Sequence, residues 1–383
     1  MKIALIAGEV SGDQLGSELA KSLFKVIPDI EISGITGKKM EEAGVVSIAS
    51  INNLSAHGLL EVAPKLWQIY KFRSWLIKKL LSIRPDWVIG IDAPDFNLGL
   101  LQQLKKNNIN TIQYVAPTVW AWRPWRINKL KDSVHNVLTL FPFEAELLQQ
   151  RDIAAKYYGH PLAREIPLIP SENYKQRKRI ALGISPKDRI ITLLPGSRTS
   201  ELIRHANILL ESARILQKKL KEQNKDEVVF YVALADEETK NIFIQQTQNQ
   251  NYGIEYQVVV DKTNDILAVS HFCIAASGTV CLQAALHHLP MVIYYQMNPF
   301  TFWFAKLLYK LPWIGLPNIL LEKTVVPELI QNEATAQKIA DTAYELFTDK
   351  FKQSEIKNQF VMLHKSLITN PTIILKQFFT TNG

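Results

Sequence analysis

The chain has 383 residues, of which 47% are hydrophobic and 21% are charged. This length predicts two domains, and the composition excludes a disordered protein. The formal net charge of +8 favours an anionic partner, such as a nucleic acid, a phospholipid surface or a phosphorylated small molecule. The only two cysteines, Cys273 and Cys281, lack the spacing of a metal site or a disulfide framework, which favours a reducing compartment.

The amino-terminal segment 1–7 is too short for a signal peptide and predicts a first strand instead. No uninterrupted apolar run approaches the roughly 20 residues that a membrane-spanning helix needs. We therefore expect a cytoplasmic protein that is still able to lie against a membrane.

A polar loop, Gly8 to Gly16, follows the first strand and opens a helix. It lacks the G-x-G-x-x-G fingerprint, and the chain has no P-loop, so nicotinamide enzymes and P-loop NTPases lose support. Glu9, Ser11 and Asp13 stand at the helix start, where Ser or Asp is first of all an N-cap. The surplus of polar groups leaves a substrate-binding role open beside the structural one.

Residues 64–84 predict a long helix with six basic residues and no acidic one. A core helix with a solvated basic face is the commoner case. Interfacial helices, however, combine a cationic face with aromatic side chains such as Trp67, Phe72 and Trp75. Near an anionic leaflet each Lys or Arg contributes roughly 1 kcal/mol, so this helix could recruit the protein to a membrane.

Two carboxylates, Asp92 and Asp95, follow the apolar run 87–91 and precede a helical pattern. The run predicts a buried parallel strand, and open parallel sheets bind ligands at the carboxyl ends of their strands. Asp is also common in helix caps and turns, so structural and catalytic roles both remain open.

A tryptophan-rich segment, 116–126, comes after the strand predicted over 110–115. Its Trp120, Trp122 and Arg123 could stack on bases or sugars, or pack as structural cation–π pairs. Its position in a strand-to-helix loop, at the sheet edge predicted to hold Asp92, favours a ligand site.

The second half repeats the alternation of strands and helices after a proline-containing boundary in 163–188. Strands are predicted at 189–194, 227–234, 254–260, 271–276 and 290–295. The alternation predicts an α/β fold of two doubly wound, Rossmann-like domains that face a central cleft.

Two turns of the second half have the character of phosphate-binding turns: Leu194 to Arg198 and Ala275 to Thr279. Small residues let backbone amides approach an anion, and the dipole of the following helix stabilises the negative charge. Arg198 can bind the anion through two hydrogen bonds. Each turn alone is weak evidence, but the pair favours a diphosphate nucleotide. No Asp-x-Asp motif occurs, so we expect no metal and no other cofactor.

The last third carries an aromatic and basic amphipathic segment over 299–313 and a predicted turn over 316–320 that contains Asn318. The helical patterns from about 334 onward show no catalytic constellation.

The ordered set of motifs resembles the lipid-A-disaccharide synthase family of glycosyltransferases along nearly the whole chain. The matching stretches are Ala7–Asp13, Gly90–Asn97, Val119–Trp122, Gly159–Pro161, Leu194–Arg198 with Glu201, Ala276–Thr279, Pro299–Phe302 and Leu316–Ile319. The resemblance implies a GT-B fold. Its acceptor-binding domain would cover 1–165 together with a returning helical segment at about 350–383, and its UDP-sugar-binding domain would cover 166–349.

The resemblance also implies the reaction. UDP-2,3-diacylglucosamine would react with 2,3-diacylglucosamine 1-phosphate to give a β(1→6) disaccharide 1-phosphate and UDP, with inversion. The family implies a peripheral location at the inner face of the inner membrane and allows a homodimer; a nucleic-acid partner is not implied.

The residue roles are carried over position by position. Asp92 would be the catalytic base. The acceptor would contact Glu9, Ser11, Asp13, Trp120, Trp122 and Arg123, and the nucleotide would contact Ser197, Arg198, Ser277, Gly278, Thr279, Gln283 and Asn318.

Two positions depart from the family pattern. Gln283 stands where Glu is expected for the ribose hydroxyls, and His57 stands where an apolar residue is expected. Three alternatives remain: another UDP-N-acetylglucosamine-dependent GT-B enzyme, a weakened paralogue that binds UDP-sugar or lipid, which Gln283 favours, and a nucleic-acid-binding protein. Binding of the last kind would weaken steeply with salt.

Overall fold

A computed structural model describes residues 1–53, 62–117, 126–223, 227–298, 302–303 and 311–382. The chain forms two compact units, which are Met1–Pro161 with Leu367–Gly383, and Leu162–Ser366. The domain boundaries predicted from the sequence lie between residues 165 and 166 and at about residue 350. The chain rejoins the first unit only at Leu367 because α16 (Lys350–Leu367) packs within the second unit, where His364 contacts His288 and the Ala163 carbonyl.

The first unit contains a seven-stranded parallel sheet in the order β3-β2-β1-β4-β5-β6-β7. Its strands are β1 (Lys2–Ala7), β2 (Glu31–Thr36), β3 (Val46–Ser50), β4 (Trp87–Ile91), β5 (Asn110–Tyr114), β6 (Asn136–Thr139) and β7 (Ala155–Tyr157). Its helices are α1 (Val10–Val26), α2 (Lys38–Glu42), α3 (Val62–Ile83), α4 (Pro94–Lys106), α5 (Arg126–Ser133), α6 (Pro142–Gln149) and α17 (Pro371–Asn382).

The central strands β1 and β4 are apolar along nearly their whole length because helices cover both faces of a parallel sheet. From β1 the chain winds outward to β2 and β3, then returns to β4 and winds the other way to β7. The winding therefore reverses between β1 and β4, and the loops that follow these two strands diverge. Ligands of open α/β sheets bind at such a switch point.

The last helix, α17, belongs to the first unit. The ring of Trp87 on β4 makes edge contacts with Phe378 and Phe379 at centroid distances of 5.5 and 5.6 Å. Leu375 and Phe378 are fully buried, so this carboxyl-terminal helix completes the core of a unit that the chain left more than 200 residues earlier.

The second unit contains a six-stranded parallel sheet in the order β10-β9-β8-β11-β12-β13, and its winding reverses between β8 and β11. Its strands are β8 (Arg189–Leu194), β9 (Val228–Leu234), β10 (Tyr256–Val260), β11 (Phe272–Ala276), β12 (Met291–Tyr295) and β13 (Glu328–Ile330). The flanking helices are α8 (Glu172–Leu182), α9 (Thr199–Glu222), α10 (Glu237–Thr247), α11 (Thr263–Val269), α12 (Thr279–Leu286), α14 (Leu316–Leu321), α15 (Ala336–Thr348) and α16, and the short α7 (Pro161–Glu165) begins at the unit boundary.

The α/β prediction is confirmed, and every strand that the apolar runs predicted is present with its ends shifted by at most a few residues. Strands β2, β3 and β13 have no predicted counterpart, and β6 and β7 fall within the sequence segments 135–140 and 153–158 that complete the first half. The predicted turn over 316–320 is wrong, because these residues form the helix α14 with Pro317 in its first turn.

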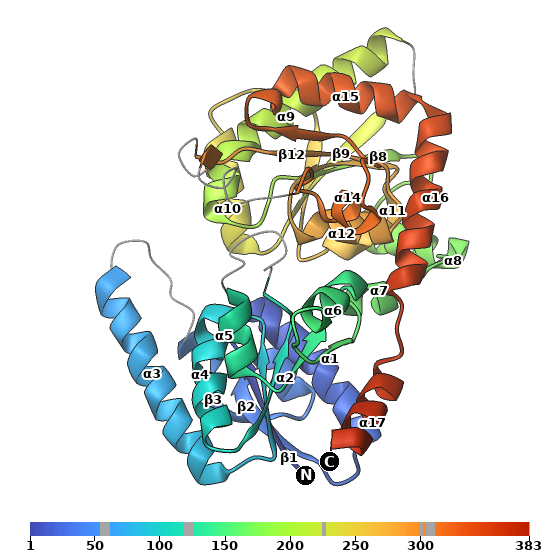
Figure 1. The fold of residues 1–383 in the computed structure, drawn as a ribbon. Coiled ribbons are helices and arrows are strands. Elements are labelled where there is room, and N and C mark those ends of the chain that lie inside the picture. The colour runs from blue at the N-terminus through green and yellow to red at the C-terminus, as the bar shows by residue number, and fades with distance from the viewer. Residues whose placement is uncertain (54–61, 118–125, 224–226, 299–301, 304–310, 383) are drawn as a thin grey trace. The chain divides into compact units, whose positions relative to one another are not determined.

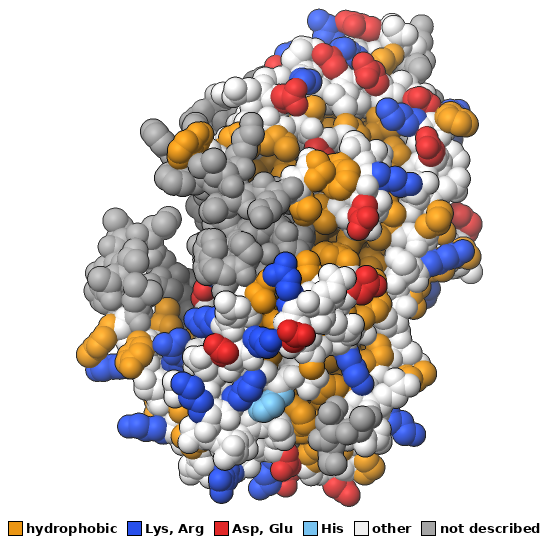
Figure 2. Space-filling model, viewed as in Figure 1, with side chains coloured by type: hydrophobic (Ala, Val, Ile, Leu, Met, Phe, Trp, Pro, Cys, Tyr) orange, Lys and Arg blue, Asp and Glu red, His pale blue; other side chains and the backbone are white. Residues whose placement is uncertain are grey.

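The long helix predicted over 64–84 is α3. Only part of its apolar and aromatic surface is buried. Leu76 and Leu80 are fully buried, whereas Trp67, Tyr70 and Trp75 are 60%, 59% and 44% exposed. Figure 2 shows hydrophobic side chains beside basic ones over this helix. Among the described helices, none has both the length and the apolar character that crossing a membrane requires.

The second unit also holds a group of neutral histidines. His271 precedes β11, and His287 and His288 follow α12. Burial, the largest cause, lowers the pKa of His271 and His288 to about 4 and that of His287 to about 3. All three rings are therefore uncharged near neutral pH.

These histidines make the stability of the protein pH-dependent. In the unfolded chain they take up protons as the pH falls through their ordinary pKa of 6.5, whereas in the folded chain they stay neutral until about pH 4. The unfolded state thus binds more protons in this window, and stability is lost as the pH falls from about 7 to about 4.

We expect the melting temperature to decrease steadily over this range. His271→Asn should flatten the decrease, because Asn can still accept the hydrogen bond that Ile190 N–H donates to His271 Nδ1 but does not titrate. Equal slopes for the two proteins would contradict this origin of the pH dependence.

Candidate functional site

At the switch point of the first unit, Asp92 follows β4 in a strained conformation. Asp92 and Ala93 have φ values of +51° and +39°, in the left-handed region that costs a non-glycine residue about 1–3 kcal/mol. The Asp92 carbonyl accepts hydrogen bonds from Asn97 Nδ2 and Gln113 Nε2, both at 2.9 Å, and its N–H donates to the Tyr114 carbonyl. The buried amides of Asn97 and Gln113 therefore hold the turn.

The end of β1 is fitted to this turn. A Cβ atom on Gly8 would lie 2.3 Å from the Cβ of Ala93, so only glycine allows the two loops to approach this closely. Ser11 Oγ donates to Asp92 Oδ2 over 3.4 Å, and Glu9 is exposed at the N-cap position of α1 without a side-chain cap bond. The structure thus brings Ser11 and Asp92 together and places Glu9 at the same edge.

The Asp13 carboxylate has a structural role that the sequence did not predict. Its carboxylate is 4% exposed and accepts hydrogen bonds from the backbone N–H groups of Gly37, Lys39 and Met40 at 2.8–3.0 Å. These are the unsatisfied donors at the start of α2. Asp13 is therefore a buried cap for α2 whose carboxylate already accepts three backbone hydrogen bonds, and its contact with the acceptor stays a prediction.

Asp95 does not cap its helix, which was one of the structural roles left open by the sequence. Ala93 is the N-cap of α4, and Asp95 lies within the first turn, where it pairs with Arg126 at the start of α5. Its side chain is 82% exposed, so this ion pair contributes little. Trp120, Trp122, Arg123 and His57 lie outside the described residues.

The switch point of the second unit carries a pocket of about 330 Å³ between the loops that follow β8 and β11. Six of the seven residues predicted to bind the nucleotide line it: Ser197, Arg198, Ser277, Gly278, Thr279 and Gln283. The seventh, Asn318, does not. Residues nearly 90 positions apart in the sequence thus meet in one cavity.

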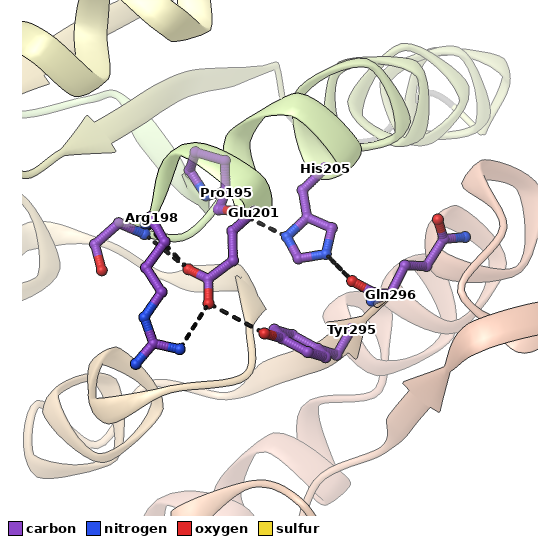
Figure 3. A network of polar contacts seen from close by, with 7 residues as sticks. Pro195, Arg198, Glu201, His205, Tyr295 and Gln296 are labelled. Atoms are coloured by element: carbon purple, nitrogen blue, oxygen red, sulfur yellow. Dashed lines mark hydrogen bonds and ion pairs between the residues drawn. The ribbon is translucent and has the colours of Figure 1, made fainter. Parts of the chain in front are cut away.

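Glu201 organises the first of these two turns (Figure 3). Its Oε2 accepts hydrogen bonds from the N–H groups of Ser197 and Arg198 at 3.1 and 3.3 Å, and its Oε1 accepts one from the Tyr295 hydroxyl. Arg198 Nη1 lies 3.7 Å from the same carboxylate, with 79% of the Arg198 side chain exposed. The first turn therefore offers the Arg198 guanidinium to an anion rather than these two amides. The amides of Gly278 and Thr279 stand at the start of α12.

His205 connects this turn to the end of β12. Its Nδ1 lies 3.0 Å from the Pro195 carbonyl, and its Nε2 lies 3.1 Å from the Gln296 N–H. Burial lowers the pKa of the ring, so it is neutral near pH 7. A proton on Nδ1 donates to Pro195 and leaves Nε2 to accept from Gln296. His205 is a positioning residue, since it does not line the pocket.

Gln283 is oriented by a neighbouring amide. Its Nε2 donates to Asn264 Oδ1 at 2.6 Å, and His287 Nε2 lies 3.4 Å from the same oxygen. Because the NH₂ group faces Asn264, the oxygen of Gln283 remains as an acceptor for a ligand.

The side-chain amide of Asn318 is bonded within the protein. Its side chain is fully buried; Nδ2 donates to the Val326 carbonyl and to Glu328, and Oδ1 accepts from the N–H groups of Val325 and Val326. All four positions of the amide are used. These bonds fix the loop before β13, and the nucleotide contact of Asn318 stays a prediction.

Three residues at or beside the pocket were missed: Glu201 as an organiser, and Tyr295 and Asn264. The capping-box spacing Arg198-Thr-Ser-Glu201 was a signal for Glu201, since Glu three residues after an N-cap bonds back to its amide. Tyr295 ends the strand beside β11, which also points to this edge. The described residues contain no group of three or more His, Cys, Asp or Glu side chains arranged to hold a metal ion.

Solved structures share this architecture. The UDP-GlcNAc 2-epimerase from Neisseria meningitidis, bound to UDP-GlcNAc, superposes on this chain with a TM-score of 0.62 at 11% sequence identity. The match covers 100% of each of the two chains. A glycosyltransferase from Rickettsia africae has a TM-score of 0.60 at 12% identity and covers 99% of this chain and 97% of its own. At such low identity these likenesses establish the fold, which is that of the GT-B glycosyltransferases and epimerases.

Sequence comparison gives the family. A family model described as lipid-A-disaccharide synthetase matches residues 3–377. The lipid-A-disaccharide synthase of Chromobacterium violaceum is 40% identical over 368 residues, covering 96% of this chain and 93% of that protein. The lipid-A-disaccharide synthase of Dechloromonas aromatica is 38% identical over 371 residues, covering 97% of this chain and 95% of that protein. The chain belongs to the lipid-A-disaccharide synthetase family, glycosyltransferases of lipid A biosynthesis.

The role of Asp13 can be tested by Asp13→Asn. The substitution replaces one acceptor oxygen with an NH₂ group that faces a backbone N–H, so we expect a loss of about 1–3 kcal/mol in the free energy of unfolding. Chemical denaturation measures this change. Unchanged stability combined with weakened acceptor binding would favour the ligand-binding interpretation.

Proposed function

We propose that this protein condenses UDP-2,3-diacylglucosamine with 2,3-diacylglucosamine 1-phosphate to form the β(1→6) disaccharide 1-phosphate and UDP. The main support is the pocket at the second switch point, where Arg198, the start of α12 and Gln283 meet. Such a group of side chains fits a nucleoside diphosphate, as the family membership implies.

The pocket would bind the nucleotide through complementary charges. The amides of Gly278 and Thr279 and the dipole of α12 would contact the diphosphate, with Arg198 opposite them. The free oxygen of Gln283 would accept a ribose hydroxyl. The Arg198 guanidinium can stabilise the charge that develops on the leaving UDP without a metal ion.

Asp92 would act as the base that removes the proton from the acceptor hydroxyl. Inversion requires in-line attack on the anomeric carbon, so the base must be held in a fixed position. The strained turn anchored by Asn97 and Gln113 provides such a position, and the Ser11 hydroxyl can orient the carboxylate. General-base catalysis contributes about 10²–10⁴-fold to a rate.

The proposed reaction is tested by incubating the purified protein with both acylated substrates and following the products by mass spectrometry. We expect one UDP for each disaccharide 1-phosphate. Unacylated sugars serve as the control acceptors and should react poorly. Epimerised UDP-sugar, or UDP without disaccharide, would contradict the proposal.

The role of Asp92 is tested by Asp92→Asn, with Asp95→Asn as the matched control at the exposed carboxylate three residues away. We expect Asp92→Asn to lower turnover about 10²–10⁴-fold while UDP affinity, measured by calorimetry, stays unchanged. Asp95→Asn should remain close to the unsubstituted protein. Near-normal turnover of a folded Asp92→Asn variant would defeat the assignment.

We further propose that α3 attaches the protein to an anionic membrane surface, where both acylated substrates would reside. Trp67 and Tyr70 are exposed on this helix, and the Lys71 ammonium lies 3.5 Å from the Trp67 ring centroid. Exposed aromatic rings among basic residues are typical of interfacial helices.

Sedimentation with phosphatidylethanolamine–phosphatidylglycerol vesicles measures this attachment. Replacing Trp67 and Tyr70 with Ala should reduce binding several-fold, whereas replacing the exposed Ile203 and Ile244 of the second unit should not. If the two double variants bind vesicles equally well, α3 is not the attachment surface.

A further inference from the structure

A second cavity of the second unit lies at the opposite edge of its sheet from the nucleotide pocket. This amino-edge groove has a volume of about 840 Å³. It is lined by α8, by the residues just before β11, by those just after α12, and by α16, which Figure 1 shows close to α8. His271 and Leu289 precede β11 and β12, so the groove adjoins the amino ends of these strands.

Positive charge predominates in the amino-edge groove. Lys175, Arg179 and Lys357 line it together with a single carboxylate, Glu172, which lies 3.5 Å from Lys175. Arg179 donates to the carbonyls of Ser185, Asp188 and Val269 and is a structural residue. Lys357 has no hydrogen-bond or ion-pair partner within the described part of the chain. The groove therefore holds an uncompensated cation.

His271 adds a donor to these cations. Its Nδ1 accepts the Ile190 N–H at 3.1 Å, which places the proton of the neutral ring on Nε2. Burial first, and then the charges of Arg179, Arg189, Lys357 and Lys175, lower the pKa of this ring. Burial and Lys175 also lower the pKa of Lys357. The environment of the groove is thus positive and rich in donors.

The groove also has an apolar rim. Ile169 and Ile180 line it and are 83% and 71% exposed, and Leu168 and Val361 line it as well. Exposed isoleucines beside cations suit a ligand with an anionic group and an apolar part. A phosphate monoester offers three acceptor oxygens to the three donors, one more than a carboxylate has.

We propose that the amino-edge groove binds a phosphate monoester, with Lys175, Lys357 and His271 Nε2–H as donors to the phosphate and the exposed isoleucines in contact with an apolar substituent. This site is separate from the nucleotide pocket and does not depend on the function proposed for that pocket.

Calorimetry of the full-length protein tests the proposal, with excess UDP present to occupy the nucleotide pocket. The probes are inorganic phosphate, octyl phosphate below its micelle concentration, and the uncharged octyl glucoside. We expect octyl phosphate to bind and octyl glucoside not to bind. Affinity for octyl phosphate well above that for inorganic phosphate supports the contact of the isoleucines with an apolar substituent, whereas equal affinities would overturn that contact.

The variant is Lys175→Gln/Lys357→Gln, and the matched control is Lys352→Gln/Lys365→Gln, which removes two exposed lysines of α16 outside the groove. We expect the first to weaken phosphate binding about tenfold or more, because charge-assisted hydrogen bonds are lost, and the control to leave it unchanged. Circular dichroism confirms that both are folded. Equal weakening by the two variants, or no binding of either phosphate probe at millimolar concentration, would overturn the proposal.

Discussion

The reversal of winding within each parallel sheet is the constraint on which the rest of this structure depends. Consecutive crossovers of the same hand cover a sheet on both faces but leave its carboxyl edge open where the winding changes direction. In the first unit this point lies between β1 and β4, and in the second between β8 and β11. Asp92 and Arg198 both stand in loops that follow these strands, so topology rather than local sequence places both candidate sites.

Each site is held in place by polar side chains that bond to its backbone turns. In the first unit, the amides of Asn97 and Gln113 stabilise a strained backbone turn. In the second, Glu201 occupies two amides of the turn after β8, and the neutral ring of His205 connects that turn to the end of β12. Low-dielectric surroundings strengthen such bonds, and these supports keep the exposed groups in place.

The central strands and the two turns of the nucleotide pocket could be predicted from the sequence. Buried parallel strands are continuous apolar runs, and small residues mark the ends of those runs. The sequence was insufficient for the structural roles of Asp13 and Asn318. Both are polar residues in motif positions, yet their bonds go to backbone groups that only the folded chain brings near, such as the Gly37 amide for Asp13. The edge strand β3 was missed for the related reason that its pairing with β2, rather than its own residues, makes it a strand.

Hydrogen exchange with and without UDP tests most directly whether the nucleotide binds to the second unit rather than to the first. We expect saturating UDP to protect peptides that cover 194–201 and 275–283 and to leave those covering 87–97 unchanged. The protection should be lost in Arg198→Gln. Protection confined to 87–97, or none in 194–201 and 275–283 at saturation, would contradict the assignment of the nucleotide to the second unit.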